Sequence, residues 1–457
     1  MNQNITGPKT SPNIPQIPRG TADILPSQIP LWIDIEVKAR HILATYGYKE
    51  IRTPMFEEIG LFKRSLGQTS DVVNKQLLAL ASGTDKEEGL APLTSLTSLA
   101  SLTSFALRPE GTASVVRSYI ENSLHKKENL SKLYYLGPMF RGERPQKGRL
   151  RQFHQIGVEA IGPDSASPYL DAEVIALNVN MLKSFGLKDF KLVINTLGSL
   201  EDKENFSKIL RDALRPHLSQ LSQESQNRFE RNVFRVLDSK NKADQAVVSH
   251  LKLNYDHLSS ESRNYFEQMK RALEDLGIPY EQSATLVRGL DYYTHTVYEI
   301  TSTALGSQDA LSAGGRYNNL VEQLGGPAAD AVGFALGIER VLLALLALGG
   351  NEEENPLGPK AFIVALDQLA LNRAFQILHA LRREGVVCDM NYKIASMKSQ
   401  MRLADKLQAE YVLILGETEY QKGIVAVKNM KTGEQQEIEA TEKNINELAN
   451  VLLMGKV

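Results

Sequence analysis

The sequence has very little of what marks secreted proteins or generally basic nucleic-acid coats. Among its 457 residues there is one cysteine, Cys388, so an intrachain disulfide framework is excluded and a reducing, cytoplasmic setting is favoured. Cys388 stands in an apolar run, and we therefore expect a buried, unreactive thiol. The net charge of −2 excludes a generally basic coat, so any contact with nucleic acid must use local patches.

Long hydrophobic runs are missing as well. The longest, Val341 to Leu348, is too short to cross a bilayer. Residues 1–18 are polar, contain four prolines and lack the apolar centre of a signal peptide, so we expect no membrane attachment and a flexible segment over residues 1–15. The length suggests roughly two to four domains, and 42% hydrophobic with 23% charged residues is ordinary for a globular protein.

Two predicted strands and a basic loop concentrate the chemistry of the chain. Leu133 to Phe140 is apolar and aromatic enough for a buried strand, and residues 151–160 alternate as a second one. Side chains on a strand point to opposite faces in turn, so one face carries Arg151, Phe153, Gln155 and Glu159. Gly157 lies on the same face and leaves open space between Gln155 and Glu159. The loop over residues 141–151 has a net charge of +4.

This pattern has a plain alternative, which is an amphipathic hairpin with a solvated basic turn. A carboxylate, an amide and an aromatic ring on a face that should be core favour a binding site instead. The arginine guanidinium groups beside them suit the phosphates of a nucleotide, and the polar side chains suit a small polar substrate.

Residues 105–113 (FALRPEGTA) predict a turn from a strand into a helix, because Pro109 and Gly111 interrupt an apolar run. Thr112 suits the N-cap of that helix. Glu110 and Thr112 therefore have two interpretations of equal weight, helix capping or contact with a ligand.

Arg288 stands in residues 285–294 (TLVRGLDYYT), which have the texture of a strand. An isolated buried charge is costly, so Arg288 needs either a ligand or an acid such as Asp291. Residues 332–340 (VGFALGIER) predict a strand with one nearly bare face, formed by Gly333, Ala335 and Gly337, which admits a flat ring or a close backbone approach. Arg340 follows at the start of a helix, a place that attracts anions.

The remaining elements surround these motifs. We expect a helix from about Pro30 to Tyr46, ended by Gly47, and then a strand from Tyr48 to Pro54, which alone describe an ordinary surface helix on an edge strand. Residues 82–104 predict a surface loop insert. Its last part, 93–104, is four copies of a triplet, and we assign it no function.

The second half of the chain changes texture twice. Residues 171–185 predict a helix and 191–195 a strand. Residues 199–280 predict a helical insertion with neither metal-ligand spacing nor a nucleophile. A polar linker, 351–359, precedes residues 360–457, where strands alternate with helices and predict a small α/β unit with parallel strand pairs.

Together these motifs resemble the class II aminoacyl-tRNA synthetases in their histidyl-tRNA synthetase form. The run FRGERPQKGRLRQFHQIGVE is similar to the second signature motif, GFALGIER to the third, and the helix and strand that end at Pro54 to the first. The runs RPEGT, AGGRY and LVRGLDYY are typical of histidyl-tRNA synthetases. Gly142 and Asn318 depart from the pattern, since relatives usually carry a larger side chain at the first position and often aspartate at the second.

The resemblance implies an α+β catalytic domain over residues 16–350, built on an antiparallel sheet and carrying the helical insertion. Residues 360–457 would be an α/β anticodon-binding domain. The first motif implies a homodimer. The insertion would touch the acceptor arm of the tRNA, although a purely structural support is nearly as strong an alternative.

The activity implied is ATP-dependent activation of L-histidine to histidyl-adenylate, followed by transfer to the 3′ end of histidine tRNA. Mg²⁺ would accompany ATP, with no dedicated metal ligands from the chain. Catalysis would fall to Arg141 and Arg288. Histidine would be bound by Glu110, Thr112, Gln155, Glu159, Tyr292 and Tyr293, and ATP by Arg141, Glu143, Phe153 and Arg340. The alternative from another class is a catalytically inactive regulatory paralogue in histidine biosynthesis, but such paralogues lack the C-terminal module.

Overall fold

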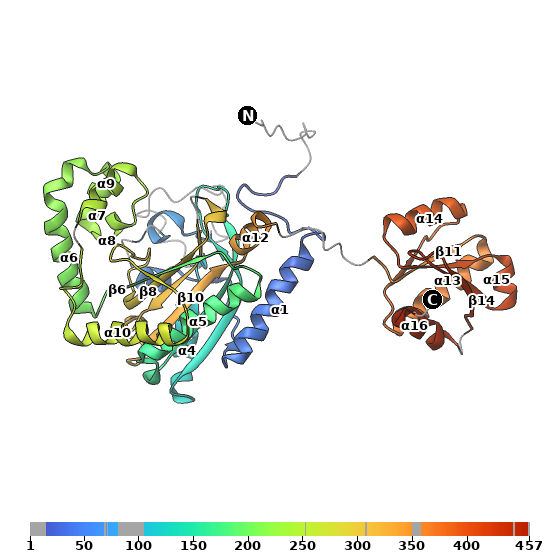
Figure 1. Ribbon diagram of the computed structural model, residues 1–457, viewed down its shortest axis with the longest axis horizontal. Coiled ribbons are helices and arrows are strands. Elements are labelled where there is room, and N and C mark those ends of the chain that lie inside the picture. The colour runs from blue at the N-terminus through green and yellow to red at the C-terminus, as the bar shows by residue number, and fades with distance from the viewer. Residues whose placement is uncertain are drawn as a thin grey trace. The chain divides into compact units, whose positions relative to one another are not determined.

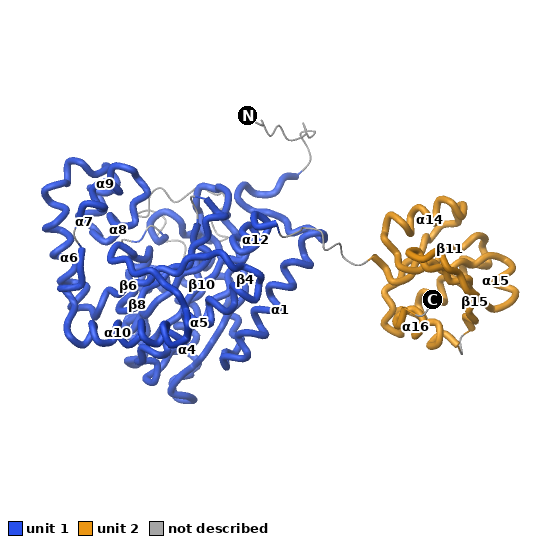
Figure 2. The backbone as a smooth tube through the Cα atoms, in the orientation of Figure 1, with its two compact units in different colours: residues 1–350 blue, residues 351–457 orange. Residues whose placement is uncertain are grey.

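The computed structural model describes residues 15–67, 70, 72–80, 105–251, 253–306, 309–349, 358–441 and 444–455. The chain divides into two compact units, residues 1–350 and 351–457 (Figure 2). The predictions for residues 1–14, for the triplets at 93–104 and for most of the linker lie outside the described residues. Across the described ranges, no helix combines the length and the apolar character that a membrane span requires.

The larger unit is built on an eight-stranded sheet in the order β1-β4-β5-β10-β9-β8-β6-β7. Its inner strands pair antiparallel, while β1 at one edge and β7 at the other run parallel to their neighbours. The strands are β1 (Lys49–Glu50), β4 (Ser131–Phe140), β5 (Gln152–Ile161), β6 (Lys191–Thr196), β7 (Glu281–Gln282), β8 (Thr294–Thr301), β9 (Ala310–Arg316) and β10 (Ala331–Gly337). The expected antiparallel α+β architecture is confirmed.

Each face of this sheet carries its own apolar cluster, because side chains alternate along the strands. On β5, Ile156, Val158 and Ala160 point into one cluster, while Phe153 packs against the other. The first face is covered by α1 (Ile29–Thr45), α5 (Pro168–Ser184), α10 (Ser260–Asp275) and α12 (Ile338–Ala347). The second face is covered by α2 (Ile59–Leu66), the π-helix η1 (Val72–Gln76), α4 (Thr112–Glu121) and α11 (Leu320–Gln323).

Smaller elements complete the unit. A two-stranded sheet joins β2 (Phe56–Glu58) to β3 (Phe105–Leu107). Single helical turns are η2 (Leu124–Lys126), η3 (Pro163–Ser165) and η5 (Thr303–Leu305).

The predicted insertion is a group of helices gathered at one side of the larger unit (Figure 1). Its elements before α10 are α6 (Leu200–Leu214), η4 (Arg215–Gln220), α7 (Gln223–Arg231), α8 (Phe234–Leu237) and α9 (Lys242–His250). It has an apolar core of its own, which includes Leu210, Phe229 and Val247. Hydroxyl and amide side chains cap its helices, as Ser199 does for α6 with Asp202 completing a capping box. The insertion thus folds around its own core and joins the sheet through α10.

The smaller unit has a five-stranded sheet in the order β12-β11-β13-β14-β15, covered by helices. As expected, β11 pairs parallel with β12 and β13, while β14 and β15 are antiparallel. Cys388 is buried, and burial raises the pKa of its thiol, in agreement with an unreactive cysteine. The elements are β11 (Ala361–Ala365), α13 (Gln368–Arg383), β12 (Cys388–Met390), α14 (Met397–Lys406), β13 (Tyr411–Leu415), α15 (Glu417–Lys422), β14 (Ile424–Asn429), β15 (Gln435–Glu439) and α16 (Ile445–Met454).

One strand prediction was wrong, and a second was right only in part. Residues 285–293 form irregular turns, and β8 begins only at Thr294, because side chains take backbone carbonyls that a neighbouring strand would otherwise pair. Residues 48–54 form a strand only at Lys49–Glu50. Further along, the Arg108 guanidinium binds the carbonyls of Thr53 and Pro54, so the strand does not extend to Pro54.

Candidate active site

A cavity of about 190 Å³ lies in the larger unit and is lined from β5, β9, β10, the start of α4 and residues 288–293. All of the predicted site residues line this one cavity, although they come from five separate stretches of sequence: Glu110, Thr112, Arg141, Glu143, Phe153, Gln155, Glu159, Arg288, Tyr292, Tyr293 and Arg340. The structure therefore brings together residues that are up to 230 positions apart in the chain.

One end of the cavity contains two buried carboxyl groups. Glu110 accepts hydrogen bonds from the backbone N–H groups of Thr112 (2.7 Å) and Ala113 (3.0 Å), and thereby caps α4. The N-cap prediction for Thr112 was wrong, because Thr112 is already the first residue of the helix and its hydroxyl donates to Glu159 Oε1 at 2.7 Å. The Tyr317 hydroxyl donates to the other oxygen of Glu159.

Glu159 fits because the strand beside it has no side chain at the facing position. It pairs in register with Gly333 on β10, where an added Cβ would lie 2.1 Å from Glu159 Oε2. The ring of Tyr135 on β4 likewise packs against two glycines. A Cβ on Gly111 or Gly157 would lie 2.2 Å from this ring. The bare faces predicted from the sequence are real, and protein side chains occupy much of the space they leave.

Burial controls the charge at this end. It raises the pKa of Glu159 to about 8, with hydrogen bonds from Thr112 and Tyr317 acting against the shift and nearby Glu110 adding to it. Burial also raises the pKa of Glu110, even though two backbone N–H groups stabilise its ionised form. A ligand that brings N–H donors or a positive charge would compensate both carboxyl groups.

The other end of the cavity is basic. Arg141 donates to the Pro109 carbonyl at 2.9 Å, and its guanidinium lies 5.2 Å from the centre of the Phe153 ring. Glu143 is the acid among these bases, 3.8 Å from Arg141 and 3.4 Å from Arg149. Guanidinium groups beside an aromatic ring suit a nucleotide with phosphates.

Arg340 fixes this basic loop to the sheet. On the first turn of α12, it donates to the carbonyls of Gly148 (3.0 Å) and Ala310 (2.8 Å). Burial lowers the pKa values of Arg340 and Arg141, but arginine stays protonated in proteins, so the positive charge remains.

Arg288 and the tyrosine pair lie between the two ends. The acid that pairs with Arg288 is Glu299 on β8, at 2.7 Å. The rings of Tyr292 and Tyr293 are 4.6 Å apart. Within the described residues, Arg288 Nε and Gln155 Oε1 are buried without a hydrogen-bond partner. Such groups are costly to leave unpaired, and both line the cavity, so they indicate a polar ligand.

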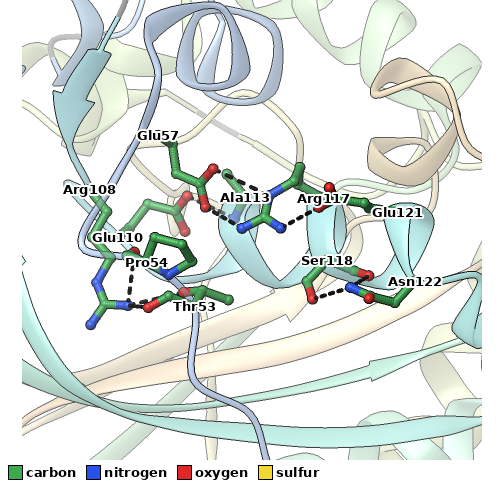
Figure 3. A network of polar contacts seen from close by, with 10 residues as sticks. All are labelled: Thr53, Pro54, Glu57, Arg108, Glu110, Ala113, Arg117, Ser118, Glu121 and Asn122. Carbon is green, nitrogen blue, oxygen red and sulfur yellow. Dashed lines mark hydrogen bonds and ion pairs between the residues drawn. The ribbon is translucent and has the colours of Figure 1, made fainter.

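Two arginines hold the strand-to-helix turn that carries Glu110 (Figure 3). The Arg108 guanidinium donates to the carbonyls of Thr53 (3.0 Å) and Pro54 (3.4 Å). It also donates to the carbonyl of Pro138 (3.0 Å). Arg117 on α4 makes a two-point contact with Glu57, at 2.6 and 3.2 Å. The position of Glu110 is thus tied to the segment that follows α1.

Sequence reasoning missed two residues of the site. Tyr317 was quoted within AGGRY without a role, yet its hydroxyl holds Glu159. Glu339 lines the cavity and accepts from the backbone N–H of His154 at 2.9 Å. A signal for each was present, because Tyr317 and Glu339 adjoin arginines within two of the quoted motifs.

Comparisons with known proteins place both units. A sequence model described as histidyl-tRNA synthetase matches residues 20–341, and one described as an anticodon binding domain matches residues 360–450. Histidine–tRNA ligase of Lacticaseibacillus casei (strain BL23) is 46% identical over 427 residues, which are 92% of this chain and 94% of that protein. The protein of the same name from Anoxybacillus flavithermus is 45% identical over 426 residues, 93% and 96% of the two chains.

A solved structure supports the same assignment. Apo histidyl-tRNA synthetase of S. aureus is 36% identical, with a TM-score of 0.75, and the match covers 97% of this chain and 100% of that one. A second structure, described as an ATP phosphoribosyltransferase regulatory subunit/histidyl-tRNA synthetase from Bacillus halodurans, is 22% identical and shows the fold alone. The chain belongs to the histidyl-tRNA synthetase family.

Proposed function

We propose that this protein is a histidine–tRNA ligase, which activates L-histidine with ATP and transfers it to histidine tRNA. One observation carries the proposal. A single cavity has buried carboxyl groups at one end, arginines at the other, and Arg288 with a tyrosine pair between them. An amino acid with an ammonium group and a polar N–H side chain, and a nucleoside triphosphate, fit these two ends.

Histidine occupies the carboxyl end. Its ammonium and imidazole N–H groups supply the donors that Glu110 and Glu159 need, and Gln155 Oε1 accepts one of them. Thr112 and Tyr317 keep Glu159 in place, while Tyr292 and Tyr293 shape the walls. Histidine with its carboxylate toward Arg288 then faces the basic end.

ATP occupies the basic end, with the adenine against Phe153 and the phosphates among Arg141, Arg288 and Arg340. An oxygen of the histidine carboxylate forms a bond to the α-phosphorus, while the bond from that phosphorus to the oxygen of the β-phosphate breaks and pyrophosphate leaves. The arginines stabilise the charge that gathers at the α-phosphate, and the site needs no covalent nucleophile.

Mg²⁺ enters with ATP. Mg²⁺ keeps most of its ligands from phosphate and water. Glu143, a carboxylate among arginines in the cavity, is the residue that would contact it. The ion would neutralise charge on the phosphates.

In the second step, a hydroxyl of the terminal ribose of the tRNA attacks the activated carbonyl, an ester forms and AMP leaves. Residues 360–457 read the anticodon. The inactive regulatory paralogue is disfavoured, because this chain keeps the arginines of the cavity and a C-terminal unit that matches an anticodon binding domain.

Further parts of the proposal concern assembly and compartment. The protein is a homodimer, since α1 leaves Ile29, Ile33 and Val37 exposed on one side, where a second copy would cover them. It works in the cytoplasm, where ATP and tRNA are available and a free thiol such as Cys388 stays reduced.

The test is histidine-dependent exchange of labelled pyrophosphate into ATP, followed by charging of histidine tRNA. Both activities are expected with histidine alone among the amino acids. Exchange without histidine dependence, or none in a folded preparation, refutes the ligase. Exchange without charging refutes only the second step.

A further inference from the structure

The helical insertion makes direct contacts with residues 286–293, which we call the substrate loop. Lys203 on α6 donates from Nζ to the backbone carbonyls of Asp291 (2.7 Å) and Tyr293 (2.8 Å). These two acceptors flank Tyr292, which lines the cavity. One side chain of the insertion therefore grips the loop on both sides of a site residue.

Two more side chains of the insertion reach the same loop. Arg235 on α8 donates from Nη1 to the Gly289 carbonyl at 2.7 Å, next to Arg288. Asn232 donates to Asp291 Oδ1 at 2.7 Å. The substrate loop has irregular turns in place of a strand, so these side chains supply part of the hydrogen bonding that a sheet would give. Bonds from a charged donor are stronger than neutral ones.

Apolar side chains also connect the insertion to the substrate loop. Phe234 and Leu237 of α8 pack both against the core of the insertion and against the cluster that contains Val287, Tyr292 and Tyr293. The Phe206 ring of α6 lies 5.6 Å from that of Phe234. The short helix α8 thus lies between the insertion and the substrate loop.

The contacts are specific to one end of the cavity. Burial lowers the pKa of Lys203 to about 8, which reflects how thoroughly its ammonium is removed from water at the loop. The hydrogen bonds described for Arg141 and Arg340, at the basic end, go instead to residues 109, 148 and 310. A movement of the insertion would therefore disturb the loop, with Arg288 in it, before it disturbs Arg141 and Arg340.

We propose that Lys203 and Arg235 are positioning residues that hold the substrate loop in its binding conformation, so that the position of the insertion sets the affinity for histidine. This rests on the proposed function, since Tyr292 and Tyr293 are assigned to histidine there, and Arg288 to its carboxylate as well as to the phosphates. Whatever the insertion binds would act on amino-acid binding through these two side chains.

The experiment uses the full chain and pyrophosphate exchange without tRNA, with Lys203→Met, Arg235→Gln and, as a matched control, Lys208→Met from the exposed side of α6. Misplacement of binding groups costs large factors, so the first two variants should raise the KM for histidine by roughly 10-fold or more. The KM for ATP should rise less, because Arg141 and Arg340 do not depend on the loop. Lys203→Arg keeps a charged donor and should recover part of the loss. Equal rises in both KM values, or no rise, overturn the proposal.

A second readout needs no activity. Hydrogen–deuterium exchange over residues 286–293, measured without substrates, should be faster in Lys203→Met than in Lys208→Met. Equal rates overturn the proposal even if the kinetics are altered. If the unaltered chain shows no histidine-dependent exchange, the proposed function fails, while the exchange rate of the loop still decides whether the insertion holds it.

Discussion

Replacing Glu159 with glutamine should stabilise the fold of the substrate-free protein and weaken the binding of histidine. Glu159 is 1% exposed, and burial raises its pKa from 4.5 to about 8. The folded chain therefore keeps this proton when the unfolded chain has released it, so the stability of the fold falls as pH rises from about 4.5 to about 8. The slope is at most about 1.36 kcal/mol per pH unit.

At pH 7 the raised pKa of Glu159 has lowered the free energy of unfolding by about 3 kcal/mol, and below pH 4.5 this loss disappears. Glutamine has nearly the same shape and never ionises. Its carbonyl can still accept from Thr112, and its amide can donate to the Tyr317 oxygen. We therefore expect Glu159→Gln to gain about 2 to 3 kcal/mol at pH 7 and less than about 1 kcal/mol at pH 5.

Urea unfolding followed by tryptophan fluorescence measures this, because the single tryptophan, Trp32, lies in the core of the larger unit. Glu204→Gln, on the exposed side of α6, is the control. A variant no more stable than the parent at pH 7, or a gain equal at both pH values, refutes the electrostatic reasoning. In the exchange assay the KM for histidine should rise far more than that for ATP, and an unchanged value for histidine removes Glu159 from the pocket.

The other predictions concern catalysis, stability and assembly. Arg288→Ala should slow exchange by roughly 10²-fold or more with the fold retained, because it removes charge beside the α-phosphate; comparable rates in a folded variant contradict that role. Arg316→Leu leaves the fully buried Asp171 unpaired, so unfolding in urea should show a loss of about 3 to 5 kcal/mol, and a loss under 1 kcal/mol would contradict the importance of this pair. Light scattering at micromolar concentration should give the mass of a dimer, and a monomer mass rejects the proposed assembly.

The sequence predicted the elements with strong periodicity and the residues inside distinctive motifs. The helix at 30–46 and the pair of strands at 133–160 have apolar spacing that only one structure satisfies, and both are present as α1, β4 and β5. The eleven candidate site residues were predicted from short motifs. The cavity that they line together depends on strand order, which no local pattern encodes.

The errors arose where tertiary contacts override local texture. Residues 285–293 have the composition of a strand, but Lys203 and Arg235 from a distant module take their carbonyls. Thr112 suits an N-cap, but a buried Glu110 performs the capping and releases the threonine hydroxyl for Glu159. In both cases the deciding partner lies outside the window that a local pattern covers.

Tyr135, which fills the space above Gly111 and Gly157, has a consequence for how this family can diverge. A methyl group added at either glycine would sit 2.2 Å from the tyrosine ring, closer than atoms can approach. A single substitution at either position should therefore destabilise the fold unless residue 135 has already become smaller. Shrinking the tyrosine first leaves a void between β5 and the start of α4, both of which line the carboxyl end of the cavity. Positions 111, 135 and 157 should therefore be inherited together. A larger residue at either glycine should be found only with a smaller residue at position 135.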